Sequence, residues 1–279
     1  MLPFRQVDVF SAEPWLGNPL AVVHQADGLT DAQMADFARW TNLSETTFLC
    51  TPTDSRADYR VRIWTTGGEL PFAGHPTIGS AQAWLEAGGT TKGDRLVQEC
   101  GAGLVAVRRS PRLGFAAPPL RRSGEVDADL RRRIVTALGV ADSAVVDMAW
   151  VDNGPGWVGV DLGTADVVVG VVPDVAAFAD LKVAVVGRWD EVRAVELGAD
   201  VEVRAFYADG RDFAEDPVTG SANAGLAQWL IGSGALPDAY VARQGSVIGR
   251  DGRVHIEARD GEIWVSGDAV TRIEGTVDL

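Results

Sequence analysis

The sequence Glu69-Leu70-Pro71-Phe72-Ala73-Gly74-His75 returns in altered form as Glu215-Asp216-Pro217-Val218-Thr219-Gly220-Ser221. The same offset of 146 positions joins Pro71 to Pro217 and Gly74 to Gly220, so the two stretches align without a gap. Self-similarity at a fixed offset indicates an internal repeat. The alignment continues downstream, where Gly79, Ala81 and Gln82 match Gly225, Ala227 and Gln228. The chain is therefore predicted to use one structural unit twice.

Each copy of the repeat stands between a predicted strand and a predicted helix. Residues 59–63 and 201–205 alternate between apolar and charged side chains, which is the pattern of a strand with one buried face. Small and apolar residues follow at helical spacing over 78–85 and 224–231, and glycine residues close both segments. Gly74 and Gly220 are therefore expected at the N-termini of two helices.

The N-terminal region adds three further elements. Residues 4–10 and 20–23 are rich in strand-forming side chains and flank the turn-forming sequence Gly17-Asn18-Pro19, so we expect a hairpin-like pair of strands. Thr30 and Gln33 form a capping box, which predicts a helix over residues 31–40. The strands and helices together predict an α/β (α+β) fold.

The length of 279 residues corresponds to about two domains. A loop-like, proline-rich segment at Pro111–Pro119 marks the expected boundary between them. We therefore predict an N-terminal half at 1–117 and a C-terminal half at 118–262. Residues 263–279 are expected to return to the first half.

The composition excludes several classes of partner. The chain has 39 acidic and 25 basic side chains and a formal net charge of −14, which repels nucleic acid and anionic lipid. Its 2 cysteines lack the C-x-x-C spacing of a zinc site and are too few for a disulfide scaffold, which fits a reducing compartment. The sequence contains no signal-peptide pattern and no apolar run of membrane-spanning length. We expect a cytoplasmic protein that binds neither nucleic acid nor membranes.

The two predicted helix starts are candidates for holding an anionic small molecule. Exposed N–H groups and the helix dipole favour a carboxylate at a helix N-terminus. Gly74 and Gly220 could therefore bind a carboxylate substrate between two facing halves. The alternative is that these glycines only allow close packing of the helices.

Side chains near the helix starts suggest acid–base chemistry. His75 and Ser221 occupy equivalent places, and Asp216 could accept a proton or orient a neighbouring group. The alternatives are a structural hydrogen bond for His75, helix capping by Asp216, and pairing of Ser221 with backbone donors. Glu45 lies between a predicted helix and an apolar strand, where partial burial would make its carboxyl easier to protonate. A surface glutamate is the alternative for Glu45.

Several familiar catalytic sites are excluded. The sequence Gly101-Ala102-Gly103 imitates a dinucleotide fingerprint but continues into a strand-like pattern rather than a helix. The chain has no P-loop and no G-x-S-x-G motif, and its 3 histidines offer no metal-binding constellation. A dinucleotide site and a metal site are therefore not expected, and acid–base chemistry on a small substrate remains.

Four motifs, in order along the chain, resemble those of the phenazine-biosynthesis isomerase family. They are Val7–Phe10 with Gly17–Val23, Asn42–Phe48, Glu69–Thr77 and Glu215–Asn223. The resemblance implies the diaminopimelate epimerase fold, in which two pseudo-symmetric halves each wrap a sheet around a central helix, with the active site between them. It also implies a homodimer.

One departure from that fold's epimerases affects the mechanism. Those enzymes use one thiol from each half, placed just before the helix-start glycine, where this chain has Ala73 and Thr219. A two-thiol mechanism is therefore absent, and we expect Cys50 and Cys100 to be buried structural thiols.

The resemblance implies a cofactor-independent isomerase that moves a proton within a small cyclic amino acid or related acid. Its model reaction is the isomerisation of trans-2,3-dihydro-3-hydroxyanthranilate. The implied alternatives are an amino-acid epimerase or racemase and a non-catalytic protein that binds a small acid. The implied roles are general acid and base for Glu45, proton movement and orientation for His75 and Asp216, and substrate binding for Asn18, Gly74, Gly220 and Ser221; for Asn18 a turn-forming role is the alternative.

Overall fold

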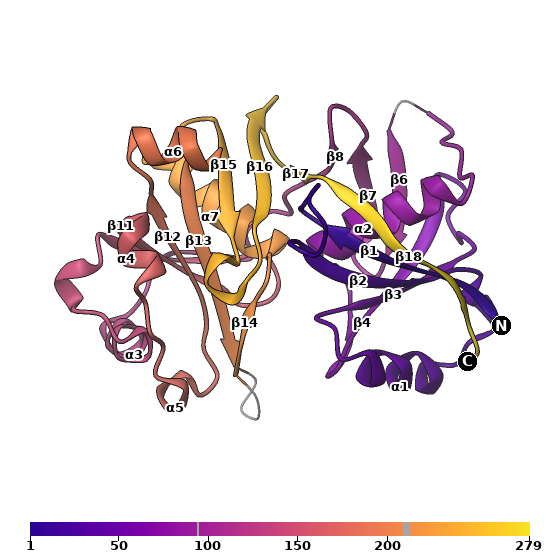
Figure 1. Cartoon of the computed structure of the whole chain (residues 1–279), viewed down its shortest axis with the longest axis horizontal. Coiled ribbons are helices and arrows are strands. Elements are labelled where there is room, and N and C mark those ends of the chain that lie inside the picture. The colour runs from indigo at the N-terminus through magenta and orange to yellow at the C-terminus, as the bar shows by residue number, and fades with distance from the viewer. Residues whose placement is uncertain (94, 209–212) are drawn as a thin grey trace. The chain divides into compact units, whose positions relative to one another are not determined.

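The computed structural model describes residues 1–93, 95–208 and 213–279. The chain forms two compact units, each with its own strands and helices (Figure 1). Unit 1 comprises Met1–Ala116 and Ser266–Leu279, and unit 2 comprises Ala117–Val265. The C-terminal segment thus belongs to the same unit as the N-terminus.

Unit 1 is a sheet wrapped around a central helix. Its elements are β1 Leu2–Val9, β2 Asn18–Val23, a 3-10 helix Ala26–Gly28, α1 Asp31–Thr41, β3 Thr46–Cys50, β4 Tyr59–Thr65, β5 Gly68–Leu70, α2 Gly74–Glu86, β6 Leu96–Cys100, β7 Gly103–Arg108, β8 Leu113–Ala116 and β18 Ala269–Val277. Pairing gives the order β18-β1-β2-β3-β4-β6-β7-β8, in which β2–β3 and β4–β6 are parallel and the other pairs antiparallel. The helix α2 contacts every strand of this series, so the sheet surrounds it.

Unit 2 is built in the same way around the helix α7. Its elements are β9 Arg122–Glu125, α3 Ala128–Leu138, a 3-10 helix Asp142–Ala144, β10 Asp147–Asp152, β11 Val158–Thr164, α4 Ala165–Val169, α5 Val175–Phe178, β12 Lys182–Arg188, α6 Glu191–Leu197, β13 Val201–Ala208, β14 Phe213–Asp216, α7 Gly220–Gly232, β15 Ala239–Gln244, a 3-10 helix Ser246–Ile248 and β16 Gly252–Arg259, and β17 Glu262–Gly267 runs across the boundary into unit 1. Pairing gives the order β9-β10-β11-β12-β13-β15-β16.

The two units share one succession of strand pairings. In unit 1 the pairs β1–β2, β2–β3, β3–β4, β4–β6 and β6–β7 run antiparallel, parallel, antiparallel, parallel and antiparallel. The pairs β10–β11, β11–β12, β12–β13, β13–β15 and β15–β16 of unit 2 repeat this series. In both units a short antiparallel strand, β5 or β14, leads to the central helix. The topology agrees with the repeat seen in the sequence.

Glycine residues let the central helices approach the surrounding strands. A side-chain carbon at Gly225 of α7 would lie 2.3 Å from the carbonyl oxygen of Val151 on β10. At Gly79 of α2 it would lie 2.6 Å from Leu20 on β2. Both helices bury residues on several faces because the sheet encloses them.

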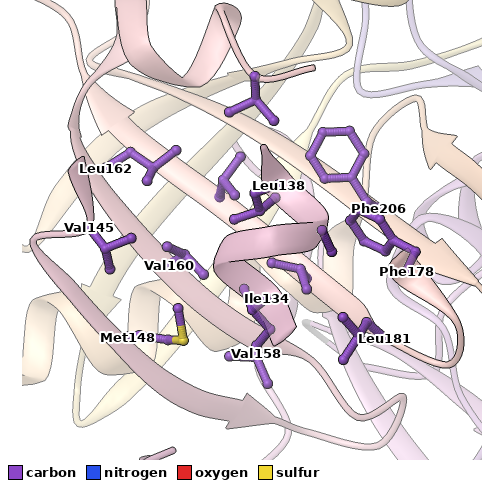
Figure 2. Packing of buried hydrophobic residues seen from close by; sticks show 14 of the residues in the cluster. Ile134, Leu138, Val145, Met148, Val158, Val160, Leu162, Phe178, Leu181 and Phe206 are labelled. Atoms are coloured by element: carbon purple, nitrogen blue, oxygen red, sulfur yellow. The ribbon is translucent and has the colours of Figure 1, made fainter. Parts of the chain in front are cut away.

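In unit 2 the other face of the sheet is covered by a second apolar cluster (Figure 2). Ile134 and Leu138 of α3 pack there with Val158 and Val160 of β11. Gly159 lies between these valines, and a side-chain carbon added there would instead lie 2.9 Å from Leu226 and 3.0 Å from Trp229 of α7. Alternate residues of β11 therefore face opposite sides of the sheet, one side packed against α3 and the other against α7.

Several local predictions are confirmed. Thr30 and Gln33 form the capping box, and α1 ends one residue beyond the predicted Trp40. Gly101 and Ala102 join β6 to β7 in a hairpin, and Gly103 begins the strand β7, so a strand and not a helix follows this sequence. Cys50 and Cys100 are buried free thiols, and burial raises the pKa of both. Among the helices of the described ranges, none has the length and apolar character needed to cross a membrane.

Candidate functional site

Glu45 lies in the short connection between α1 and β3. The helix ends at Thr41, and Asn42 takes a left-handed conformation with φ 52° while its N–H donates to the carbonyl of Ala38. The chain then turns, and Thr46 begins β3. The Glu45 side chain is 16% exposed, so it is partly buried.

His75 lies one residue inside α2 and faces this glutamate. Its Nδ1 is 3.3 Å from Oε2 of Glu45, and its side chain is 4% exposed. Burial lowers the pKa of His75 from 6.5 to about 3, because water no longer solvates the charged imidazolium. At neutral pH the contact therefore joins a neutral imidazole to a carboxyl group rather than two opposite charges.

The second ring nitrogen of His75 has an unmet hydrogen-bonding requirement. Within residues 1–93, 95–208 and 213–279, Nε2 of His75 is buried and has no hydrogen-bond partner. Leaving a buried polar atom unsatisfied costs about 1–3 kcal/mol. Such an atom in a native protein calls for an explanation, and a polar atom of a bound molecule would satisfy it.

The central helices differ from other long helices at their N-termini. The side chain of Thr30 caps α1, and that of Asp127 caps α3. Among the residues that the structure describes, no side chain caps α2 or α7, whose preceding residues are Ala73 and Thr219. The first N–H groups of a helix need an acceptor, and an anion can supply it. Gly74 and Gly220 are the first residues of these two helices.

Asn18 is the first residue of β2 and is fully buried. The loop before it is shaped by Asp8, whose carboxylate accepts hydrogen bonds from the N–H groups of Trp15 and Gly17 at 2.7 and 3.0 Å. Asn18 therefore begins a strand, opposite Val9, instead of standing inside a turn. Because β2 and β3 are parallel and Ala21 pairs with Thr46, Asn18 and Glu45 lie at the same end of these strands.

Asp216 in unit 2 does not cap a helix. It is the last residue of β14, and α7 begins only at Gly220, after the N-cap residue Thr219. The Thr219 hydroxyl donates a hydrogen bond of 2.5 Å to Oδ2 of Asp216. Asp216 is 8% exposed. The capping interpretation of Asp216 is therefore wrong, and its carboxylate is instead held by a hydroxyl donor.

Ser221 is held by two residues that the sequence analysis missed. Its Oγ accepts a hydrogen bond of 3.0 Å from Nε1 of Trp157, and its carbonyl accepts one of 2.8 Å from Nδ2 of Asn153. Both partners lie in the connection between β10 and β11, where Asp152 accepts from the N–H groups of Gly154 and Gly156. This connection corresponds to the loop that Asp8 shapes in unit 1. A comparison of the two loops in the sequence would have identified the segment that contains Asn153 and Trp157.

The described ranges contain no group of three or more His, Cys, Asp or Glu side chains that could hold a metal ion. Open pockets of about 480 and 570 Å³ lie in unit 1, beside Trp84 and beside Arg56. Neither is lined by a predicted site residue. The candidate site is therefore defined by the contact between Glu45 and His75 rather than by either pocket.

Known proteins match the chain over almost its entire length. The family model described as phenazine biosynthesis-like protein matches residues 7–275. The chain belongs to this family. It is 34% identical to antisense-enhancing sequence 1 of Schizosaccharomyces pombe, over 98% of this chain and 97% of the relative. It is 33% identical to trans-2,3-dihydro-3-hydroxyanthranilate isomerase of Pseudomonas fluorescens, over 98% of both chains.

Structural similarity extends equally far. The crystal structure of a PhzF-family phenazine biosynthesis protein from Enterococcus faecalis superposes with a TM-score of 0.80 and 25% identity, and the match covers 100% of this chain and 99% of that one. Several curated relatives of the phenazine biosynthesis-like family are named isomerases. The chain is an isomerase of this family.

Proposed function

We propose that this isomerase moves a proton within a small cyclic amino acid or related acid without a cofactor, and that Glu45 is its general acid and base. The contact between Glu45 and the buried His75, whose Nε2 has no partner in the described part of the chain, carries the proposal. The relative from Pseudomonas fluorescens, named for trans-2,3-dihydro-3-hydroxyanthranilate, supports this substrate class.

The proposed reaction is balanced without any external electron acceptor. Glu45 removes a proton from a carbon next to an unsaturated acid, and the electron pair of that C–H bond shifts into the conjugated system. The protonated Glu45 then returns the proton to another carbon, so the product has the formula of the substrate. General acid–base catalysis of this kind contributes typically about 10² to 10⁴ in rate.

His75 suits a carboxyl group that must change its protonation state. A neutral imidazole can donate its Nδ1 proton to a carboxylate, or accept a hydrogen bond from a carboxylic acid in the other tautomer. Because burial keeps His75 neutral, it can stabilise Glu45 in both states. An arginine in the same place would favour only the carboxylate.

The roles of the other site residues belong to the same proposal. The backbone at Gly74 and Gly220 and the side chains of Asn18 and Ser221 bind the substrate carboxylate and its neighbouring polar groups. Asp216 orients the substrate and assists proton movement. Their support is the uncapped starts of α2 and α7 and the burial of Asn18.

The Glu45→Gln variant tests the proposal. Glutamine keeps the size of the side chain but cannot exchange a proton, so we expect kcat on trans-2,3-dihydro-3-hydroxyanthranilate to fall by about 10² to 10⁴. Circular dichroism and thermal unfolding should match the parent protein. Glu125→Gln, on the exposed strand β9, is the matched control and should retain full activity. Full activity of Glu45→Gln, on a substrate that the parent turns over, would refute the proposal.

A further inference from the structure

Gln244, the last residue of β15, is fully buried at the start of α7. Its Oε1 accepts hydrogen bonds from the N–H of Thr219 at 3.0 Å and from Nδ2 of Asn223 at 2.9 Å. Its Nε2 donates to the carbonyl of Asp216 at 3.0 Å and to Oγ1 of Thr219 at 2.9 Å. All the usual hydrogen-bonding positions of the amide are thus occupied.

The backbone fixes which way this amide points. The N–H of Thr219 can only donate, so the amide oxygen must face it, and the carbonyl of Asp216 can only accept, so the amide nitrogen must face that. The second proton of Nε2 then points at Oγ1 of Thr219. Since that oxygen already accepts a hydrogen bond, the hydroxyl proton is left to bind Oδ2 of Asp216, at 2.5 Å.

We propose that Gln244 is a positioning residue that directs the Thr219 hydroxyl toward Asp216 and thereby keeps the Asp216 carboxylate oriented and ionised. The hydrogen-bond chain runs in one direction, from the Gln244 amide through the Thr219 hydroxyl to Oδ2 of Asp216. A donor aimed at a carboxylate favours its charged form. The consequence for catalysis rests on the proposed function, in which Asp216 acts on the substrate.

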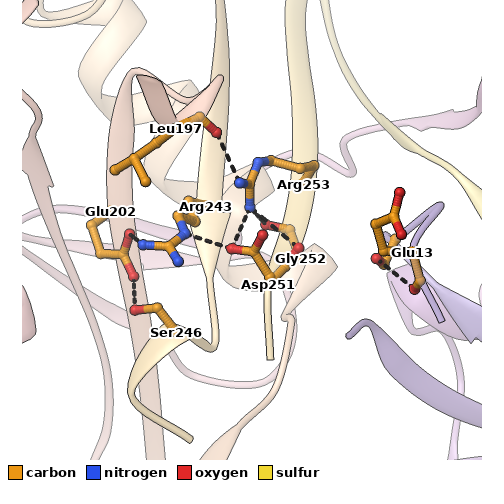
Figure 3. Close-up of polar contacts among 9 residues, drawn as sticks. Glu13, Leu197, Glu202, Arg243, Ser246, Asp251, Gly252 and Arg253 are labelled. Carbon is orange, nitrogen blue, oxygen red and sulfur yellow. Dashed lines mark hydrogen bonds and ion pairs between the residues drawn. The ribbon is translucent and has the colours of Figure 1, made fainter. Parts of the chain in front are cut away.

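A network of charged groups surrounds Arg243, the residue before Gln244 on β15 (Figure 3). The preceding residue, Arg243, lies between Glu202 and Asp251, at 3.8 and 2.5 Å. Asp251 also pairs with Arg253, and Ser246, just beyond Gln244, donates to Glu202. These charged groups pair with one another, as Arg204 of β13 does with Glu215 of β14. The Thr219 hydroxyl donates to Oδ2 of Asp216.

Unit 1 contains the same glutamine without the same carboxylate. Gln98 on β6 stands 146 positions before Gln244 and is also fully buried. Its Nε2 donates to Oγ1 of Thr77 on α2, and its Oε1 accepts from the Tyr59 hydroxyl. The positions equivalent to Asp216 and Thr219 hold Leu70 and Ala73. In the described part of the chain both glutamines thus anchor a central helix, and the hydrogen bonds of Gln244, unlike those of Gln98, lead to a carboxylate.

This difference supplies the matched set of variants. Thr219→Val removes the hydroxyl and keeps the branched shape, Thr219→Ser keeps the hydroxyl, and Gln244→Met removes the donor to Thr219. Gln98→Met is the control, because it deletes an equally buried amide that reaches no carboxylate. A hydrogen bond to a charged group is worth enough to change kcat/KM by about tenfold to a hundredfold.

We expect kcat/KM to fall by that factor in Thr219→Val and Gln244→Met, and the acid limb of its pH profile to move to higher pH. Thr219→Ser should restore both quantities. Gln98→Met should lower the melting temperature and leave the acid limb where it is. A loss of activity that is equal at every pH, or a rise of the acid limb in Gln98→Met, would reduce Gln244 to a packing role and overturn the inference.

A measurement without substrate separates this inference from the proposed function. The carboxyl resonance of Asp216 is followed by ¹³C NMR as the pH is lowered, in the parent and in Thr219→Val. The inference predicts a midpoint at higher pH in Thr219→Val, whether or not a substrate is turned over. An unchanged midpoint would overturn it. A raised midpoint in a protein that isomerises no tested acid would support the inference and count against the proposed function.

Discussion

Burial sets the chemical state of His75. Its ring is surrounded by protein, with the carboxyl of Glu45 at Nδ1 and no partner in the described chain at Nε2. The loss of hydration outweighs the attraction of a nearby carboxylate, so the imidazole stays neutral well below neutral pH. A histidine in this state can exchange a hydrogen bond with both forms of a carboxyl group.

The same burial makes the stability of the protein depend on pH. Burial lowers the pKa of His75 to about 3 and that of His24, with help from the adjacent Arg5 charge, to about 4. As pH falls below 6.5, the unfolded chain binds protons that the folded chain does not, so the folded state loses stability. Each histidine lowers the free energy of unfolding by up to roughly 1.4 kcal/mol for each pH unit below 6.5.

Urea unfolding at pH 7 and pH 5 checks this prediction. The free energy of unfolding should decrease between these values in the parent protein. The decrease should be smaller in His75→Gln and in His24→Gln, since each variant removes one group that the unfolded state protonates. Parallel pH dependence in the parent and both variants would contradict the buried neutral state.

Residue types and motif context were enough to single out Glu45, His75 and Asp216, but not their contacts. The Glu45–His75 contact arises because Asn42 ends α1 and returns the chain beside the start of α2. Gln244 escaped notice because it acts across 25 positions, on Thr219. A buried glutamine in an alternating strand carries no local signal of such a role.

At the level of elements, the sequence predicted the starts of the central helices because the repeat and the apolar spacing agree there. Both α2 and α7 begin at the predicted glycines. The lack of a side-chain cap on α7 could not be predicted, because its N-cap residue, Thr219, is of a type that often caps helices. In the structure its hydroxyl is directed to Asp216.

The close approach of α7 to β10 gives an element-level prediction. Gly225→Ala should destabilise the protein by about 1–3 kcal/mol or more, because the new carbon would lie 2.3 Å from the Val151 carbonyl. Gly232→Ala, at the end of the same helix and facing open space, should be neutral or stabilise by up to about 1 kcal/mol. Denaturant unfolding of the two variants checks both values. Equal effects would contradict the close packing of α7 on β10.

At the scale of the whole molecule, the two units repeat an ion pair as well as a topology. Arg62 of β4 binds Glu69 of β5 through two hydrogen bonds of 2.7 Å. Arg204 of β13 binds Glu215 of β14 in the same way, at 2.9 and 2.8 Å. The repeat predicted the equivalence of Glu69 and Glu215, whereas the arginine partners required the strand register.

The two pairs differ in burial, which predicts different costs of breaking them. Side-chain exposure is 3% for Arg204 and 10% for Glu215, against 23% for Arg62 and 38% for Glu69. Arg204→Met leaves a buried charge unpaired and should destabilise unit 2 by about 3–5 kcal/mol. Arg62→Met should cost unit 1 about 1 kcal/mol or less. Amide hydrogen exchange measures the stability of each unit separately. Equal losses of stability in Arg204→Met and Arg62→Met would contradict an effect of the difference in burial.

The duplication and the strand–helix order of the chain could be read from the sequence, because periodicity and a fixed offset report them directly. The parallel pairs β2–β3 and β4–β6 could not, since they join strands separated by a helix. The pair β2–β3 sets Thr46, the first residue of β3, against Ala21 of β2, so Glu45 and Asn18 lie at the same end of these two strands.

The most direct test of the central claim is an NMR time course in D₂O with trans-2,3-dihydro-3-hydroxyanthranilate and the parent protein or Glu45→Gln. The account predicts an isomeric product with a new C–H or C–D bond at a second carbon, formed about 10² to 10⁴ times faster by the parent than by the variant. Conversion that does not depend on Glu45, or deuterium entering a stereocentre with inversion, would contradict a proton shuttle carried by Glu45.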